Sequence, residues 1–161
     1  MYLTLADDAS PTPVPPKIEA RLLRSGEEDL WCQTSARGWG ASAELTNFLL
    51  DFGKALVEAE GLHAFLASRE GTPNTAGALR CRQGVALFAG ASTVPEARNQ
   101  GAQRALLAAR IQLARAQRCD LAMMCAAPGS ASEPNAERQG FRVAYTRTQW
   151  QLAAGIRRNT A

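Results

Sequence analysis

The most informative stretch of this 161-residue chain runs from residue 91 to residue 107: Ala91-Ser92-Thr93-Val94-Pro95-Glu96-Ala97-Arg98-Asn99-Gln100-Gly101-Ala102-Gln103-Arg104-Ala105-Leu106-Leu107. It predicts a strand that ends near Pro95, a tight turn, and a helix that begins near Gln100. The first turn of such a helix carries free backbone N–H groups and a partial positive charge, which favour an anion. Gly101 has no Cβ, so the backbone can approach a bulky phosphate closely. The stretch therefore predicts a phosphate-binding turn.

The segments on either side of this turn alternate between strand and helix patterns. Strands are expected at residues 18–23, 63–68, 76–82, 85–94, 119–126 and 141–152. Helices are expected over residues 30–40, 42–61, 100–118 and 132–139. Ser42 is the expected N-cap of the second helix, in which apolar residues recur at helical spacing: Leu45, Leu49, Phe52 and Leu56. The predicted order is β-α-α-β-β-β-α-β-α-β.

This order predicts an α/β (α+β) fold with a mixed, mostly antiparallel sheet flanked by helices. Residues 63–94 form an antiparallel meander, and the helix at 100–118 crosses over to a parallel strand. That strand, at 119–126, is apolar apart from Asp120, which is typical of a strand buried on both faces. The arginines of the crossover helix are expected to lie off its apolar face: Arg104, Arg110, Arg115 and Arg118.

Composition favours one globular domain, because 46% of the residues are hydrophobic and 20% are charged. The net charge of +3 comes from cations that are spread along the chain without a dense run, so no nucleic-acid partner is expected. The four cysteines form no CxxC pair and His63 is the only histidine, which predicts no metal site.

The chain has neither a secretory leader pattern nor a membrane-length apolar run, so we expect no membrane insertion and a reducing, cytoplasmic location. Within the chain, a Pro-rich arm is expected at 1–16, the domain at 17–152 and a tail at 153–161.

Two motifs resemble those of the GNAT (Gcn5-related) N-acetyltransferase superfamily. Arg98 and Gly101 match its pyrophosphate-loop pattern, Gln/Arg-x-x-Gly-x-Gly/Ala, while Gln103 occupies the last position and departs from it. Residues 135–141, Asn-Ala-Glu-Arg-Gln-Gly-Phe, resemble the family's closing helix and its Gly-Phe step into the next strand. The resemblance covers about residues 85–150, and the earlier segments agree in their order.

The resemblance implies that acetyl-coenzyme A is the cosubstrate and that an acetyl group is transferred to an amine of a small molecule or a peptide. It also implies that the pantetheine arm pairs with the backbone of the strand before the loop. The residues expected to bind the cofactor are Ser92, Thr93, Val94, Arg98, Asn99, Gln100, Gly101, Ala102, Gln103, Arg104 and Asn135.

The catalytic groups of the family are only partly matched. Its usual acid, a Tyr four residues before the Gly-Phe step, is Ala136 in this chain, so Ser132, Tyr145 or water would protonate the leaving thiolate. The strand at 85–94 lacks the family's Glu, which leaves as candidate bases Glu44, Glu58, Glu96 and His63. Two alternatives therefore stay open: a catalytically silent acyl-CoA-binding module with a regulatory or scaffolding role, and an unrelated α/β domain that binds another phosphate.

One sheet position is also open. The family normally closes with a two-stranded hairpin after the Gly-Phe step, whereas this chain has only residues 141–152 for it. The vacant position is either left open or filled by Tyr2 to Leu5, by a second copy in a homodimer, or by a missing second acetyltransferase-like half.

Overall fold

The computed structural model describes residues 1–5, 17–40 and 42–150. Most of the expected Pro-rich arm and all of the expected tail lie outside the described residues. The described chain is built around a six-stranded sheet with the order β1-β6-β5-β4-β3-β2. Its strands are β1 (Tyr2–Thr4), β2 (Ile18–Leu22), β3 (Leu62–Arg69), β4 (Thr72–Arg82), β5 (Val85–Thr93) and β6 (Leu121–Met124). Neighbouring strands are antiparallel except for β5 and β6, which are parallel.

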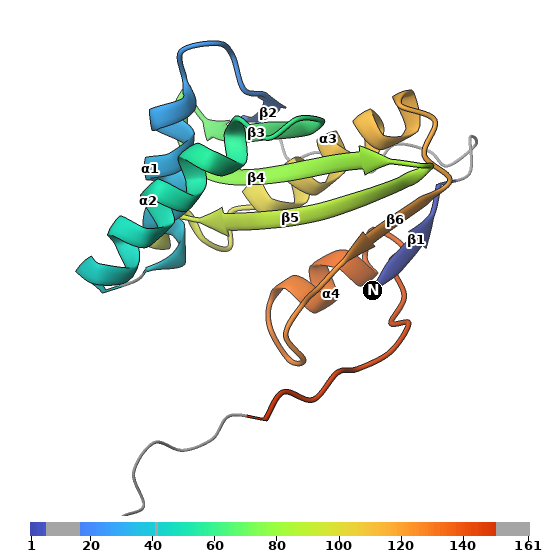
Figure 1. Cartoon of the computed structure of the whole chain (residues 1–161). Coiled ribbons are helices and arrows are strands. Elements are labelled where there is room, and N and C mark those ends of the chain that lie inside the picture. Colours follow the sequence, from blue (N-terminus) through green and yellow to red (C-terminus); the bar gives the residue numbers. More distant parts are fainter. Residues whose placement is uncertain (6–16, 41, 151–161) are drawn as a thin grey trace, which may run out of the picture.

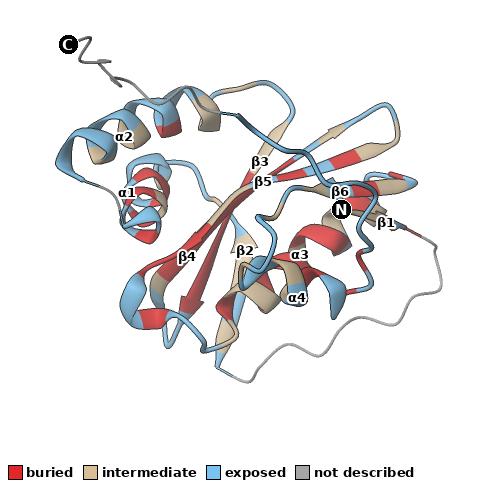
Figure 2. Cartoon of the chain, turned by 90° about the horizontal axis from the view of Figure 1, so that it is seen from below, coloured by how far each residue is buried: buried red, intermediate tan, exposed pale blue. Residues whose placement is uncertain are grey.

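Helices cover both faces of this sheet, as Figures 1 and 2 show. One face carries α1 (Glu28–Trp39) and α2 (Ala43–Val57), and the other carries α3 (Ala102–Ala116) and α4 (Ser132–Glu137). A short 3-10 turn, η1 (Pro95–Ala97), joins β5 to α3. Because α3 connects the parallel strands β5 and β6 along the chain, it is the crossover that such strands require. The predicted fold class, a mixed sheet flanked by helices, is confirmed.

The expected last strand is wrong. In the described part of 141–152, only Arg142 pairs with the sheet, through an isolated antiparallel bridge to Tyr2. The place beside β6 is taken by β1 instead, which is one of the alternatives that the sequence left open. In the register of the Tyr2–Arg142 bridge, Val143 stands opposite Met1, and no described strand lies opposite the residues that follow.

Apolar residues of two predicted elements are exposed. The apolar spacing of α2 correctly predicts a helix with Ser42 as its N-cap, but Leu45 and Phe52 are exposed and only Gly53 is buried. Cys119–Ala126 was expected to be buried on both faces, yet Met123 is exposed. In both cases the element forms as predicted, but no other described element covers its outer side.

Arg110 departs from the expectation that the arginines of α3 face solvent, because it is fully buried. Its Nη1 donates to the carbonyl oxygens of Ala78 in β4 and Ala89 in β5, at 3.2 and 3.5 Å. Its guanidinium also lies 5.2 Å from the centre of the Phe88 ring. Burial lowers the pKa of Arg110 to about 10, so the side chain stays charged at neutral pH. It connects α3 to the two central strands.

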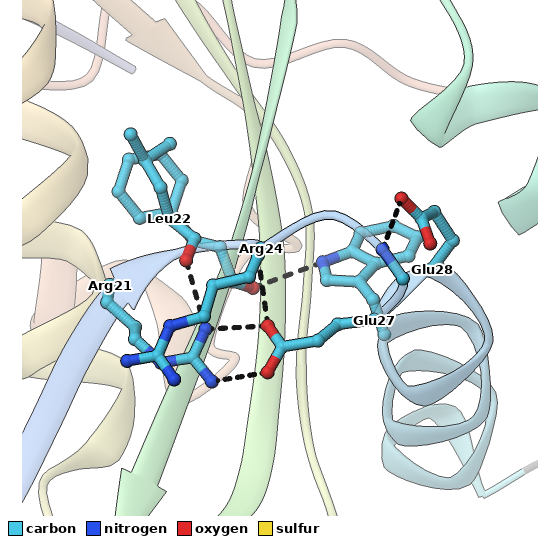
Figure 3. A network of polar contacts seen from close by, with 8 residues as sticks. Arg21, Leu22, Arg24, Glu27 and Glu28 are labelled. Atoms are coloured by element: carbon cyan, nitrogen blue, oxygen red, sulfur yellow. Dashed lines mark hydrogen bonds and ion pairs between the residues drawn. The ribbon is translucent and has the colours of Figure 1, made fainter.

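The turn that leads into α1 is held by a polar network (Figure 3). Arg21 of β2 donates two hydrogen bonds to the carboxylate of Glu27, at 2.7 and 2.8 Å. The same carboxylate accepts a hydrogen bond from the backbone N–H of Arg24 at 2.9 Å. The hydrogen bond from Arg21, followed by that from Arg24, lowers the pKa of Glu27 to about 2. This network fixes where α1 begins.

We expect Glu27→Gln to lower the free energy of unfolding at pH 7 but not near pH 2. A depressed folded-state pKa stabilises the protein above the ordinary value of 4.5, and this stabilisation disappears as the pH falls toward 2. Urea denaturation of both proteins across this range measures the difference. A difference that stayed constant with pH would contradict the assignment.

Candidate functional site

A cavity of about 660 Å³ opens between the end of β5, the start of α3 and the helix α4. Ten of the eleven residues predicted to bind the cofactor line it: Ser92, Thr93, Arg98, Asn99, Gln100, Gly101, Ala102, Gln103, Arg104 and Asn135. The eleventh, Val94, is buried and does not line the cavity. Its backbone N–H donates to the carbonyl of Asn74 at 2.9 Å. The structure thus gathers nearly all of the predicted binding residues around one space.

Two residues with left-handed backbone conformations shape the turn that precedes α3. Asn99 has a φ of 61° and Gly101, the N-cap of α3, has a φ of 87°. No side chain caps this helix end, and its first turn holds no acidic residue. The first N–H groups of α3 therefore remain available as donors to an anion in the cavity.

Arg98 braces this turn against the rest of the domain. Its Nη2 donates to the carbonyl of Gly38, at the end of α1, at 3.0 Å, and its Nε donates to the carbonyl of Thr93 at 3.3 Å. The sequence predicted it as a cofactor ligand, but its hydrogen bonds go to these two backbone carbonyls. Arg98 therefore acts first as a tie between α1, β5 and the turn.

Gln103, the residue that departs from the family pattern, is also engaged with the protein. Its Nε2 donates to the hydroxyl of Thr93 at 2.9 Å. That hydroxyl lies 3.1 Å from the hydroxyl of Thr75, which in turn lies 3.0 Å from Oδ1 of Asn74. A chain of polar side chains thus runs from α3 across β5 to β4, and it fixes the start of α3 against the sheet.

The cavity continues into a split in the sheet. β5 and β6 pair only as far as Phe88 and Met124, and beyond this point β5 has β4 alone as its neighbour. From Ala89 to Thr93, no strand pairs with the edge of β5 that faces away from β4. The carbonyls of Ala89 and Thr93 already accept from Arg110 and Arg98, so an extended molecule could pair with the residues between them. This is the part of β5 that runs into the cavity.

Solved structures share this fold, although no protein-family model and no curated protein matches the sequence. The aminoglycoside N-acetyltransferase AAC(6')-Iy in complex with coenzyme A has a TM-score of 0.65 and 16% identity, over 88% of this chain and 98% of that one. A predicted acetyltransferase from Clostridium acetobutylicum with acetyl-CoA has a TM-score of 0.62 and 12% identity, over 83% and 96%. A GCN5-related N-acetyltransferase from Kribbella flavida has a TM-score of 0.56 and 22% identity, over 76% and 45%.

This chain has the GNAT fold. In it, α4 presents Ser132, Asn135 and Arg138 to the cavity from one side, since residues three apart lie on the same helix face. Ala136, at the position of the family's usual Tyr, is fully buried and belongs to the main apolar core. Ser132 is therefore the residue of α4 whose hydroxyl group lines the cavity.

The other catalytic candidates lie elsewhere on the GNAT fold. Tyr145 is exposed on the segment after Arg142 and does not line the cavity. His63 lines a separate hollow beside the start of α1, and Glu96 is exposed and paired with Arg37 at 2.6 Å. Glu44 and Glu58 are exposed, on α2 and just beyond it. The described lining of the cavity holds neither a carboxylate nor an imidazole.

The charge of the lining is positive. Three of its residues are arginines, Arg98, Arg104 and Arg138, and among the described residues none of its members is acidic. Nε of Arg104 is buried without a hydrogen-bond partner in the described protein.

Within residues 1–5, 17–40 and 42–150, no three His, Cys, Asp or Glu side chains are placed to hold a metal ion. No helix in these ranges has the length and hydropathy needed to cross a membrane.

Gly38 is a site residue that sequence reasoning missed, because a glycine near Trp39 and Gly40 was read only as a helix end. It allows α1 to lie directly on β5. A Cβ at this position would lie 2.5 Å from Oγ of Ser92 and 2.9 Å from the backbone N of Thr93. The hydroxyl of Ser92 donates to the carbonyl of Ser35 at 2.9 Å, so its side chain is turned toward α1.

We expect Gly38→Ala to lower the free energy of unfolding by roughly 1–3 kcal/mol, because the added methyl group forces α1 away from β5. Urea denaturation measures the change, with Gln33→Ala on the exposed side of the same helix as the control. Equal stability of the two variants would show that α1 does not pack as closely on β5 as described.

Proposed function

We propose that this chain is an acetyl-CoA-dependent N-acetyltransferase whose acceptor is an amine of a small molecule or a peptide. One observation carries the proposal: an uncapped start of α3 faces a cavity with three arginines and no acidic residue among its described lining. The GNAT-fold structures compared above, crystallised with coenzyme A or acetyl-CoA, support the same choice of cosubstrate.

The residues present suit a phosphorylated cofactor. The backbone N–H groups at the start of α3 would donate to the diphosphate, with Gly101 as the N-cap. Arg104 and Arg138 would neutralise its charge from two sides. The unpaired edge of β5 between Ala89 and Thr93 would hold the extended amide chain as an additional strand. Arg98 and Gln103 would keep this frame rigid, since both are bonded to the protein.

Acetyl-CoA, when bound, supplies an activated thioester. The chain would hold the acceptor amine beside it, and the amine nitrogen would bond to the acetyl carbon as the carbon–sulfur bond breaks. Ser132, which lines the cavity, would donate a hydrogen bond to the departing thiolate. Since the described lining offers no base, the proton of the amine would pass to water.

We expect acetyl-CoA at about 100 times its dissociation constant to raise the melting temperature by roughly 5–10 °C. Gly101→Glu should abolish this shift, because it adds bulk and negative charge at the anion site. Gly101→Ala is the matched control: it bears the same strain from a φ of 87° without the charge. If Gly101→Glu kept the full shift, the cofactor would not bind at this turn.

Turnover is tested separately, by thiol release from acetyl-CoA with a panel of amines. We expect Ser132→Ala to lower kcat by about 10-fold or more with unchanged affinity for acetyl-CoA, because only the leaving group loses its donor. Binding without turnover on any amine would instead support the silent acyl-CoA-binding module.

A further inference from the structure

The outer side of α2 carries an apolar stripe that no other described element covers. Leu45, Phe48 and Phe52 are 48%, 60% and 52% exposed. They occupy helix positions i, i+3 and i+7, so their side chains share one face. The rings of Phe48 and Phe52 stack on each other, with 6.0 Å between their centres and 12° between their planes. Figure 2 shows that most of α2 is exposed. We call these three residues the α2 stripe.

The α2 stripe is not needed to hold α2 on the domain. The helix contacts α1 and β3 through its other side, where Leu50, Leu56 and Val57 pack against a buried apolar cluster. On that side Gly53 lies so close to α1 that a Cβ there would lie 3.0 Å from Sγ of Cys32. Neighbouring large apolar side chains left in water often form interaction surfaces. The stripe is therefore available to a partner.

A line of carboxylates borders the α2 stripe. Glu44, Asp51 and Glu58 are seven residues apart, which places them along one side of the helix, and all three are exposed. At about 100° per residue, this line runs along the flank of the stripe that lies away from Gly53. Within the part of the chain that the structure describes, none of the three carboxylates forms an ion pair. Their charge is left for a partner to neutralise.

We propose that the α2 stripe is the docking site of a partner helix that is amphipathic and carries Lys or Arg along the margin of its apolar face. Leu45, Phe48 and Phe52 have the spacing at which one helix holds the apolar face of another. Charges beside an apolar seam select the partner, as they do in coiled coils, and an acidic line selects a basic one. This surface is separate from the cavity, so the proposal does not rest on the acetyltransferase activity.

Other occupants match the charge of this surface less well. A second copy of the chain would bring the same acidic line instead of a basic one, and an anionic membrane would be repelled by it. The size of the surface also sets an expectation for affinity. The 15 residues of α2 span roughly 22 Å. A single helix packed along this length would bury less than about 1,200 Å², the range of weak and transient interfaces, so we expect micromolar binding.

The first test uses a fluorescein-labelled peptide of roughly 15 residues, made of Leu and Lys with Leu at helical spacing, and measures its binding by fluorescence anisotropy. We expect Phe48→Ala and Phe52→Ala each to raise the dissociation constant about 10-fold, because each removes an apolar anchor. Tyr145→Ala is the matched control. Tyr145 is an aromatic residue that is 77% exposed on another segment, so its replacement should leave binding unchanged. Circular dichroism checks that every variant keeps its helices.

The second test reverses the charges. A matched peptide carries Glu in place of every Lys, and we expect the unaltered chain to bind the Lys peptide about 10-fold or more tightly than the Glu peptide. Glu44→Lys combined with Asp51→Lys should reverse this preference. Glu19→Lys combined with Glu137→Lys changes the net charge equally at exposed positions on β2 and α4, so it should not reverse it.

Equal affinity for the two peptides would overturn the proposal, as would a Lys-peptide affinity that Phe48→Ala and Phe52→Ala leave unchanged. Two further measurements test the other occupants. A dimer in sedimentation equilibrium that Phe48→Ala dissociates would show that a second copy covers the α2 stripe. Binding to vesicles of anionic phospholipid without binding to the Lys peptide would show a membrane surface instead. Either result would also overturn the proposal.

Discussion

The cavity depends on the separation of β5 from β6. The two strands pair only as far as Phe88 and Met124, so the rest of β5 runs on with an open edge toward the start of α3. Arg110 lies at the apex of this split, where it donates to the carbonyl of Ala89 and rests against the ring of Phe88. A buried cation without a carboxylate partner is costly, and here backbone carbonyls and a π face offset that cost. The same side chain fixes α3, whose uncapped first turn faces the cavity.

The position of α1 is the second constraint on the cavity. Arg21 and Glu27 fix the start of this helix, and Gly38 allows its end to touch β5. From that end, the carbonyl of Gly38 accepts a hydrogen bond from Arg98. The loop before α3 is therefore held by a contact more than fifty residues away in sequence. The contacts of Gly38 with Ser92 and with Arg98 join elements that no local pattern relates to one another.

The difference between local and long-range interactions explains which features could be predicted from the sequence. The strand, turn and helix around Gly101 depend on local backbone preferences, which the sequence shows directly. The hydrogen bonds of Arg98 and Gln103 within the protein depend on which carbonyl or hydroxyl the fold brings near them, so the sequence could not show them. Their binding of the cofactor stays a prediction. Periodicity correctly predicted α2 as a helix but did not indicate its burial, since spacing shows that a face is apolar and not what covers it.

The arrangement separates binding of the cofactor from choice of the acceptor. Fixed N–H groups and arginines on the α3 side suit a polyanion whatever the acceptor is. The described lining contains no acidic residue that would attract a polycationic amine. The compared AAC(6')-Iy is named as an aminoglycoside N-acetyltransferase, and aminoglycosides are polycationic amines. A shared fold at 16% identity does not carry their recognition to this chain.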